Sequence, residues 1–237
     1  MAGYVVSEHE VKASARANDT ASVRLMIGPG QGCKRLEQRV VRFAPGRSQP
    51  QALEDRQSVL YVVAGTGRLI VGDDVEELEP QTGVYVVAGE TFQIEHSGPG
   101  DLVVVLVTAP QELSTVPTNG RTVRWEDRPS LPASPDREFR FLVDKDVGCH
   151  DITQFVGVIP SGCAPTHSHT YDEVVYVIEG EGLLHLNGEK TPIAAGSCIH
   201  LPPLVEHCLE NTGASPMRVL GVFHPAGDPA SRASQGL

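Results

Sequence analysis

The chain has 237 residues, 40% of them hydrophobic, so it can bury one or two cores and is too short for three ordinary domains. Acidic residues outnumber basic ones by 30 to 19, and no lysine and arginine cluster forms the basic stripe that a nucleic-acid backbone requires. We therefore expect no nucleic-acid partner. Gly (24) and Pro (18) are plentiful and aromatic residues make up only 5%, which favours an all-β protein of short strands and tight turns.

Membrane spans, signal peptides and cysteine spacing indicate the cellular compartment of a protein. No stretch approaches the roughly 18 consecutive apolar residues of a membrane span, and the first residues lack the order of a signal peptide. We expect a cytoplasmic protein with no membrane partner. The five cysteines are odd in number and include no CxxC pair, so we interpret them mainly as small buried apolar residues.

An internal repeat organises the chain. VLYVVAGTGRL at residues 59–69 overlays VVYVIEGEGLL at residues 174–184 at a shift of 115 residues, with six identities in eleven positions. The same shift places Gly98 on Gly213. We therefore predict a duplication of one structural unit.

Each copy contains short β-rich runs bounded by Gly or Pro, as in a sandwich or barrel. In the first copy these are RVVRF, VLYVV, RLIVG, GVYVV and DLVVVLV, and in the second VVYVI, LLHLNG, IHLPP and MRVLGVF. We predict two tandem β-barrels with little helix. The first module spans residues 1–115, a Pro-rich linker spans 116–138, and the second module spans 139–237. The small, polar residues after Pro225 are expected to be mobile.

Histidine is concentrated in the second copy, where seven of the nine lie after residue 119. Residues two apart on a strand share a face, so His167 and His169 can both point into a barrel while Glu173 enters from the next strand. His207 adds a third imidazole. Three imidazoles and one carboxylate suit Fe(II), Mn(II), Ni(II), Cu(II) or Zn(II) and leave one or two coordination positions open. Single histidines on strands, such as His185, are interpreted as ordinary hydrogen-bonded residues.

These residues resemble the two conserved motifs of the cupin family. The first motif is a Gly, then HxH, three or four residues, Glu, six residues and Gly, matched here by Gly162, His167, His169, Glu173 and Gly180. The second is matched by Pro192, Gly196, Pro202, Pro203, His207 and Asn211. One departure is that four rather than five residues separate Gly162 from His167. The resemblance implies a bicupin, made of two tandem cupin-type jelly-roll barrels, with metal ligands His167, His169, Glu173 and His207.

The first module lacks this ligand set. A shift of 115 places Ala52, Glu54, Ser58 and Phe92 at the four ligand positions. We expect this degenerate module to bind no metal and to supply a partner sheet, cover an edge strand or shape one wall of the second module's mouth. An alternative is that the emptied barrel binds an organic ligand.

Strand alternation predicts the surroundings of the metal. If Glu173 points inward, Val175 and Val177 also point inward and Tyr176 points outward, which gives an apolar lining. Cys208 should point away from the metal by the same rule. Asn211 shares the face of His207 and could orient a ligand or make a hydrogen bond near a turn.

The leading hypothesis for function is a metal-dependent enzyme that acts on a small organic molecule, with an Fe(II)-type dioxygenase favoured. Iron is the first choice of metal, and Mn, Ni, Zn or Cu are alternatives. Glu173 has two possible catalytic roles, as a metal ligand or, once displaced by substrate, as a general base. The alternatives are a non-redox isomerase, cyclase, lyase or hydrolase, and a metabolite-binding cupin without turnover. The resemblance also implies a homodimer, because cupins commonly pair through edge strands.

Overall fold

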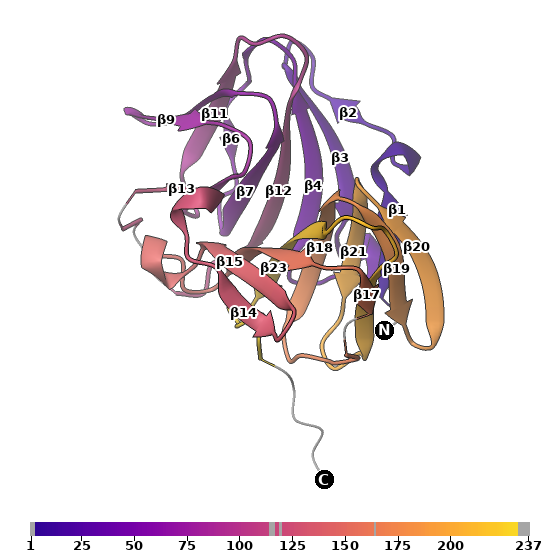
Figure 1. Cartoon of the computed structure of the whole chain (residues 1–237). Coiled ribbons are helices and arrows are strands. Elements are labelled where there is room, and N and C mark those ends of the chain that lie inside the picture. The colour runs from indigo at the N-terminus through magenta and orange to yellow at the C-terminus, as the bar shows by residue number, and fades with distance from the viewer. Residues whose placement is uncertain (1–2, 114–116, 119, 164, 232–237) are drawn as a thin grey trace.

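The computed structural model describes residues 3–113, 117–118, 120–163 and 165–231 (Figure 1). It confirms the all-β prediction, because the strands form four antiparallel sheets that close into two jelly-roll barrels. Among the residues described, no helix is long and apolar enough to cross a membrane. The helical elements are single 3-10 turns: η1 (Glu8–Glu10), η2 (Pro29–Gln31), η3 (Trp125–Asp127) and η4 (Lys145–Val147).

The first barrel consists of a seven-stranded and a five-stranded sheet. The larger sheet has the order β13 (Thr122–Arg124), β10 (Thr82–Val86), β7 (Arg56–Ala64), β12 (Leu102–Pro110), β4 (Glu37–Phe43), β3 (Ala21–Ile27) and β2 (Ser14–Ala15). The smaller has the order β5 (Gly46–Arg47), β11 (Thr91–His96), β8 (Gly67–Val71) and β9 (Asp74–Leu78), with β6 (Gln51–Ala52) also paired to β11.

The second barrel repeats this plan. Its larger sheet has the order β1 (Tyr4–Ser7), β21 (Ser197–Leu201), β18 (Asp172–Glu179), β23 (Met217–His224), β16 (Thr153–Ile159), β15 (Arg137–Val143) and β14 (Leu131–Ser134). Its smaller sheet has the order β17 (Gly162–Cys163), β22 (His207–Asn211), β19 (Glu181–Leu186) and β20 (Glu189–Ala194).

The two repeats exchange their first strands. β1, near the N-terminus, pairs with β21 of the second barrel, with Tyr4 opposite His200. β13, which occupies the equivalent place before the second repeat, pairs with β10 of the first barrel, with Arg124 opposite Thr82. Each barrel therefore has one edge of its larger sheet covered by a strand from the other half of the sequence.

This exchange differs from the predicted domain boundaries. Residues 4–7 of the predicted first module belong to a sheet of the second barrel, and residues 122–134 of the predicted linker contain β13, η3 and β14. The boundary at residues 115 and 116 lies outside the described residues. Proline content concealed these strands because an edge strand tolerates proline, as at Pro132 in the edge strand β14.

The core has three layers. The two larger sheets face each other, and one cluster between them includes Val59, Tyr61, Tyr176 and Leu220. The interior of each barrel has its own apolar cluster. Because the larger sheets are buried on both faces, their central strands are almost continuously apolar, as in β12.

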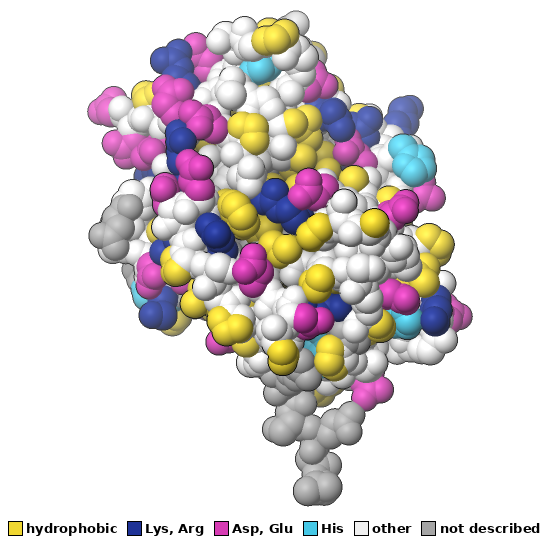
Figure 2. Space-filling model, in the orientation of Figure 1, with side chains coloured by type: hydrophobic (Ala, Val, Ile, Leu, Met, Phe, Trp, Pro, Cys, Tyr) yellow, Lys and Arg dark blue, Asp and Glu magenta, His cyan; other side chains and the backbone are white. Residues whose placement is uncertain are grey.

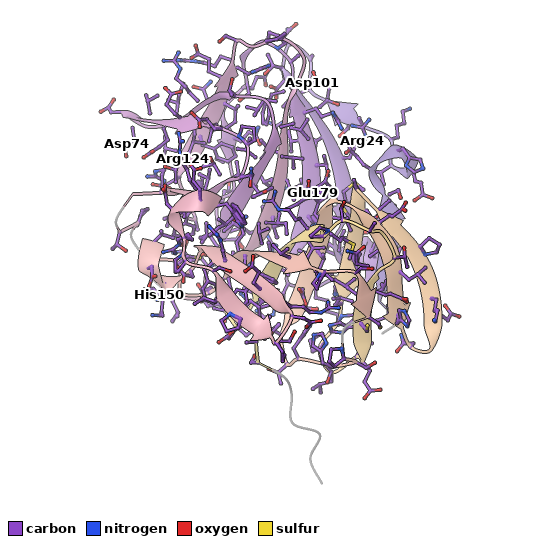
Figure 3. All side chains as sticks on the ribbon, in the orientation of Figure 1. Arg24, Asp74, Asp101, Arg124, His150 and Glu179 are labelled. Atoms are coloured by element: carbon purple, nitrogen blue, oxygen red, sulfur yellow. The ribbon has the colours of Figure 1, made fainter. Side chains whose placement is uncertain are left out.

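On the face shown in Figure 2, acidic and basic side chains are interspersed. Many are paired, as in the contacts of Glu95 with Arg47 and Arg68. The side-chain view in Figure 3 places His150, which is exposed, on the outside of the second barrel.

Candidate metal centre

The four predicted ligands come together at one end of the second barrel. His167 and His169 lie between β17 and β18, Glu173 lies on β18, and His207 opens β22. An isolated antiparallel bridge holds His167 opposite His207, with amide-to-carbonyl distances of 3.1 and 2.9 Å in the two directions. The amide of Leu204 also donates to the carbonyl of His169 at 2.7 Å. Backbone hydrogen bonds therefore fix the positions of these side chains.

The side chains converge closely. The ligand atoms of His169, Glu173 and His207 all lie within 4.8 Å of one another, and all three residues are buried. Nε2 of His169 is 2.8 Å from Oε2 of Glu173. His167 lies beside this group, with its ring centroid 4.5 Å from that of His207, and is only half-buried.

Each imidazole is held by a backbone carbonyl two residues away. Nδ1 of His169 lies 2.8 Å from the carbonyl oxygen of Tyr171, and Nδ1 of His207 lies 2.8 Å from that of Val205. Nδ1 of His167 lies 3.2 Å from the carbonyl oxygen of Pro165. A carbonyl only accepts, so each Nδ1 carries the proton and donates it, which leaves Nε2 as the metal-binding lone pair.

This arrangement fits a divalent cation. With Nδ1 of His169 protonated, the Nε2 lone pair faces a carboxylate oxygen of Glu173, and two acceptors at 2.8 Å need a proton or a cation between them. Glu173 is also 7% exposed, and a buried carboxylate requires a compensating positive charge. Burial lowers the pKa of His207 to about 4, against the opposing effect of Glu173, so this imidazole is neutral at neutral pH, as a metal ligand must be.

A cavity of about 120 Å³ opens beside these residues. Its walls are mainly apolar and come entirely from the second repeat, including Val175 and Leu201. Val175 and Val177 belong to the interior cluster while Tyr176 belongs to the cluster between the barrels, which confirms the predicted alternation along β18. The first barrel does not line this cavity. It covers the opposite face of the larger sheet instead.

Aromatic rings form one side of the cavity. Tyr171 stacks on both His169 and Phe223, with ring-centroid distances of 4.3 and 4.1 Å, and the His169 and Phe223 centroids are 6.0 Å apart. Phe155 contacts Phe223 at 4.9 Å and lies over Gly221, where an added Cβ would be 2.2 Å from the Phe155 ring and 3.1 Å from Oε1 of Glu173. Sequence reasoning missed these rings, although Tyr171 continues the alternation of His167, His169 and Glu173.

Residues after Pro225 complete this wall as far as the structure describes them. The Tyr171 hydroxyl donates to the carbonyl of Asp228 at 3.1 Å, and the Thr153 hydroxyl donates to that of Gly227 at 2.9 Å. Pro229 lines the cavity. The described part of the tail is thus packed against the aromatic wall, in contrast to the predicted mobility, and residues 232–237 lie outside the described residues.

One cationic side chain lies at the cavity. Arg137 of β15 is among the lining residues, and its Nη2 donates to the carbonyl of Gly162 at 3.5 Å. Its Nε is buried and has no hydrogen-bond partner among the described residues. Sequence reasoning did not single out Arg137, because nothing in its local pattern distinguishes it from a surface arginine.

Two further candidates have structural roles. Asn211 donates to the carbonyls of Ile159 and Ser215 and accepts from the amide of Gly213, so it organises a loop. Cys208 lies on the opposite face of β22 from His207, as predicted.

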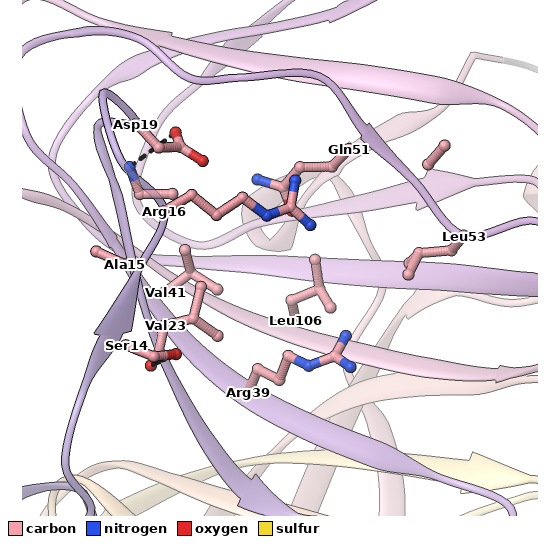
Figure 4. Close-up of a pocket in the computed structure, with 12 residues that line it drawn as sticks. Ser14, Ala15, Arg16, Asp19, Val23, Arg39, Val41, Gln51, Leu53 and Leu106 are labelled. Atoms are coloured by element: carbon pink, nitrogen blue, oxygen red, sulfur yellow. Dashed lines mark hydrogen bonds between the residues drawn. The ribbon is translucent and has the colours of Figure 1, made fainter.

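The mouth of the first barrel is built differently. Register places Gln51 opposite Phe92, as His167 lies opposite His207, so the counterpart of His167 is Gln51 and not Ala52. A one-residue difference between the repeats before β7 explains the shift. The cavity there has a volume of about 400 Å³ and is lined by Arg16, Arg39 and Leu106 among others (Figure 4).

Comparison with known proteins agrees with this architecture. The family model described as "Cupin domain" matches residues 39–108 and 154–223, more than half of the chain. The chain belongs to the cupin family. Its two matched segments fall in the two barrels, so it is a bicupin.

Two curated relatives match short segments of this bicupin. An uncharacterized protein from Methanocaldococcus jannaschii is 36% identical over 70 residues, which are 29% of this chain and 56% of the relative. An oxalate-binding protein from Thermotoga maritima is 34% identical over 65 residues, which are 27% of this chain and 54% of the relative. The matches span just over half of these relatives.

Solved structures match the whole fold at low identity. A putative glyoxylate-induced protein from Pseudomonas aeruginosa has a TM-score of 0.82 at 18% identity, covering 99% of this chain and 92% of that one. Protein Ylba from E. coli has a TM-score of 0.79 at 13% identity, covering 94% and 90%. A variant of Bacillus subtilis oxalate decarboxylase has a TM-score of 0.76 at 13% identity, covering 93% and 76%. At these identities the likeness concerns the fold alone.

Proposed function

We propose that this bicupin is a metal-dependent enzyme that acts on a small organic anion in the second barrel. The proposal rests on one observation: the buried carboxylate of Glu173 and the Nε2 atoms of His169 and His207 lie close together at the wall of an apolar cavity. The ligands would be His167, His169, Glu173 and His207. The first barrel would act as a structural partner.

A divalent transition metal in this site supplies Lewis-acid chemistry, and iron adds one-electron redox chemistry. The chain supplies the rest. The carbonyls of Pro165, Tyr171 and Val205 orient the imidazoles, and the rings of Phe155, Phe223 and Tyr171 exclude water. Glu173 is the one carboxylate among the ligands, so an oxygen of Glu173 released by an incoming substrate would be placed to accept a proton from it.

The cavity restricts the substrate class. A volume of about 120 Å³ is well below the roughly 300–1,000 Å³ of typical drug-sized sites, so the substrate would have few heavy atoms. Arg137 lines this cavity together with the acidic Glu138, and guanidinium groups bind carboxylates in a forked geometry. We therefore favour a small carboxylic acid or an enolate derived from one.

Two reaction classes are retained. An Fe(II)-type dioxygenase is the first candidate, because a mixed histidine and carboxylate set with open positions suits Fe(II). The second is a non-redox reaction on a small carboxylate with Mn(II). It is favoured by Arg137 and by the name of an oxalate-binding relative, and Mn(II) is chosen because one matched structure describes the Mn(II) centers of oxalate decarboxylase.

Metal content tests the site itself. Protein purified without chelator should hold close to one transition metal per chain, and His169→Ala or Glu173→Gln should lower the metal affinity by more than the roughly 10- to 100-fold cost of losing an outer-shell partner. His150→Ala, at an exposed histidine of the same barrel, should retain the wild-type metal content. An equal metal content per chain in all three variants would refute the ligand assignment.

Turnover tests the reaction. Samples loaded with iron or manganese would be mixed with small carboxylates, enols and catechols, and oxygen uptake and product formation would be followed. Oxygen-dependent turnover with iron supports the dioxygenase, whereas turnover that persists without oxygen supports the non-redox reaction. Stoichiometric ligand binding without any turnover across the panel would instead indicate a metabolite-binding protein.

A further inference from the structure

A second group of chemically reactive residues lies on the reverse face of the strand that carries His207. Along β22, His207 faces the cavity while Cys208 and Glu210 share the opposite face. Cross-strand neighbours complete the group, because His185 of β19 lies opposite Cys208 and Cys163 of β17 lies opposite Glu210. None of these four side chains belongs to the metal centre.

Two short contacts define this cluster. Sγ of Cys163 lies 2.7 Å from Sγ of Cys208, and Nε2 of His185 lies 2.6 Å from Oε2 of Glu210. The ligand atoms of Cys163, His185 and Glu210 are all within 4.8 Å of one another. An imidazole oriented by a carboxylate therefore has a ring nitrogen within 4.8 Å of Sγ of Cys163, one of the two sulfurs in contact.

The two thiols differ in access to solvent. Cys163 is exposed and is the one exception to the expectation that the cysteines are mainly buried, whereas Cys208 is buried. The remaining cysteines, Cys33, Cys149 and Cys198, are all buried. Burial raises the pKa of Cys33 to about 11 and that of Cys149 to about 12, which keeps them as unreactive thiols. Among the five cysteines, only Cys163 and Cys208 combine an accessible thiol with a second sulfur in contact.

We propose that Cys163 and Cys208 form a reversible disulfide when the protein meets hydrogen peroxide. Cys163 is the attacking residue because it is exposed, and Cys208 is the resolving residue because its sulfur is already in contact. This inference does not depend on the reaction proposed for the metal centre.

The chemistry proceeds in two balanced steps. His185 accepts the proton of the Cys163 thiol, and the thiolate attacks one peroxide oxygen, which gives a sulfenic acid and, after protonation of the leaving hydroxide, one water. Sγ of Cys208 then attacks the sulfenic sulfur, so that the S–S bond forms as the S–O bond breaks. The leaving hydroxide takes up the proton of the Cys208 thiol and departs as a second water. The two thiols lose two electrons in total, and one hydrogen peroxide is reduced to two waters.

Such a bond would enclose the metal centre. Residues 163 to 208 contain His167, His169, Glu173 and His207, so the cross-link would close a loop that holds every proposed ligand. A cross-link stabilises mainly by restricting the unfolded chain. We therefore expect oxidation to raise the Tm of the metal-free protein, and dithiothreitol to reverse the rise.

Thiol counting tests the proposal on the wild-type chain. The native protein would be treated with one equivalent of hydrogen peroxide, unfolded and alkylated, and its intact mass would be measured by mass spectrometry. The expected result is loss of two of the five alkylation sites and of two hydrogens, both restored by dithiothreitol. Because the tryptic peptides 146–190 and 191–218 each contain two cysteines, fragmentation of the linked peptides would identify the bonded pair.

Variants provide the matched controls. Cys163→Ser should keep all four of its remaining alkylation sites. Cys208→Ser should lose only the Cys163 site, as a sulfenic acid that adds one oxygen to the mass, and should form no disulfide. Cys149→Ser should still lose two sites. Cys163→Ser alters an exposed position, so it is expected to fold even if Cys208→Ser does not.

Three results would overturn the proposal. The first is five free thiols after oxidation of the native wild-type protein. The second is oxidation of Cys163 beyond the sulfenic acid with Cys208 still free. The third is a zinc ion bound to the untreated protein and lost in Cys163→Ser, which would assign Cys163, His185 and Glu210 to a metal instead.

Discussion

At the scale of single residues, the candidate centre depends on what fixes each ligand. Nδ1 of each histidine donates to a carbonyl two residues away, so the local chain conformation aims Nε2 at the cavity. The spacing in the sequence predicted which four candidate ligands the structure brings to this cavity. Their hydrogen-bonded carbonyls were not predictable, because carbonyl direction depends on backbone angles that residue names do not specify.

Gly221 gives a residue-scale prediction. Gly221→Ala should lower the free energy of unfolding by about 1–3 kcal/mol, because its Cβ would lie 2.2 Å from the Phe155 ring, and it should weaken metal binding by displacing Glu173. Thermal unfolding and metal titration would measure the two effects. Gly30→Ala is the matched control, since a Cβ there meets nothing within 4 Å. Wild-type metal affinity in Gly221→Ala would contradict the role given to this glycine.

His224 gives a prediction about pH. Its ring is 2% exposed with neither nitrogen hydrogen-bonded among the described residues, and burial lowers its pKa, opposed by Glu112, Asp151 and Asp172 and assisted by Arg35. Below a pH of about 6.5 the unfolded chain therefore binds a proton that the folded chain does not, so stability falls as pH falls.

The unfolding temperature measured between pH 7 and 5 checks this sign. The unfolding temperature of His224→Leu should fall less than that of the wild type over that range, because leucine has no group to titrate at this position. His150→Leu, at the exposed His150 labelled in Figure 3, should show the same change of unfolding temperature with pH as the wild type. An identical slope in His224→Leu and the wild type would be inconsistent with a lowered pKa.

At the scale of secondary-structure elements, the notable feature is the exchange of β1 and β13. Most strands were predictable because alternating and continuous apolar runs are local signals. The predicted boundaries placed residues 4–7 in the first module and residues 122–124 in the linker. They missed the exchange because strand pairing depends on which sheet edge is free in three dimensions. The guanidinium groups of Arg140 and Arg218 lie over the ring of Trp125, at the start of η3, with distances of 4.0 and 4.7 Å to the ring centroid, and these contacts anchor the connection between the repeats.

β1 can be tested by placing a charge in its buried face. Val6 is 7% exposed and packs in the cluster between the barrels, so Val6→Asp should cost at least about 2 kcal/mol of stability. It should also release β1 from β21 and expose an edge strand, which light scattering would detect as association. Ala17→Asp, at an exposed position, introduces the same charge and should behave like the wild type.

At the scale of the whole molecule, the two barrels pack against each other and are joined by exchanged strands. They share the cluster between their larger sheets and exchange their first strands. Residues 139–237 alone, the predicted second module, lack β1 and β14 and would expose the apolar face that includes Tyr176 and Leu220.

We therefore expect residues 139–237 expressed alone to aggregate or to lack a cooperative unfolding transition. The full chain should unfold in a single transition, as followed by circular dichroism and calorimetry. A soluble second module with the stability of the full chain would contradict this view. Homodimerisation remains a prediction at this scale, and light scattering of the full chain would test it.

The duplication, the cupin motifs and the four candidate ligands could be predicted from the sequence, because each depends on residue identity at short, fixed spacing. The three-dimensional arrangement was needed to show which strands cross between the barrels, that residues 226–231 pack on the aromatic wall, that Arg137 lies at the cavity, and that Cys163 meets Cys208. These features join residues distant in sequence or unremarkable in composition. Their contacts arise from how the sheets close, and no local pattern encodes that closure.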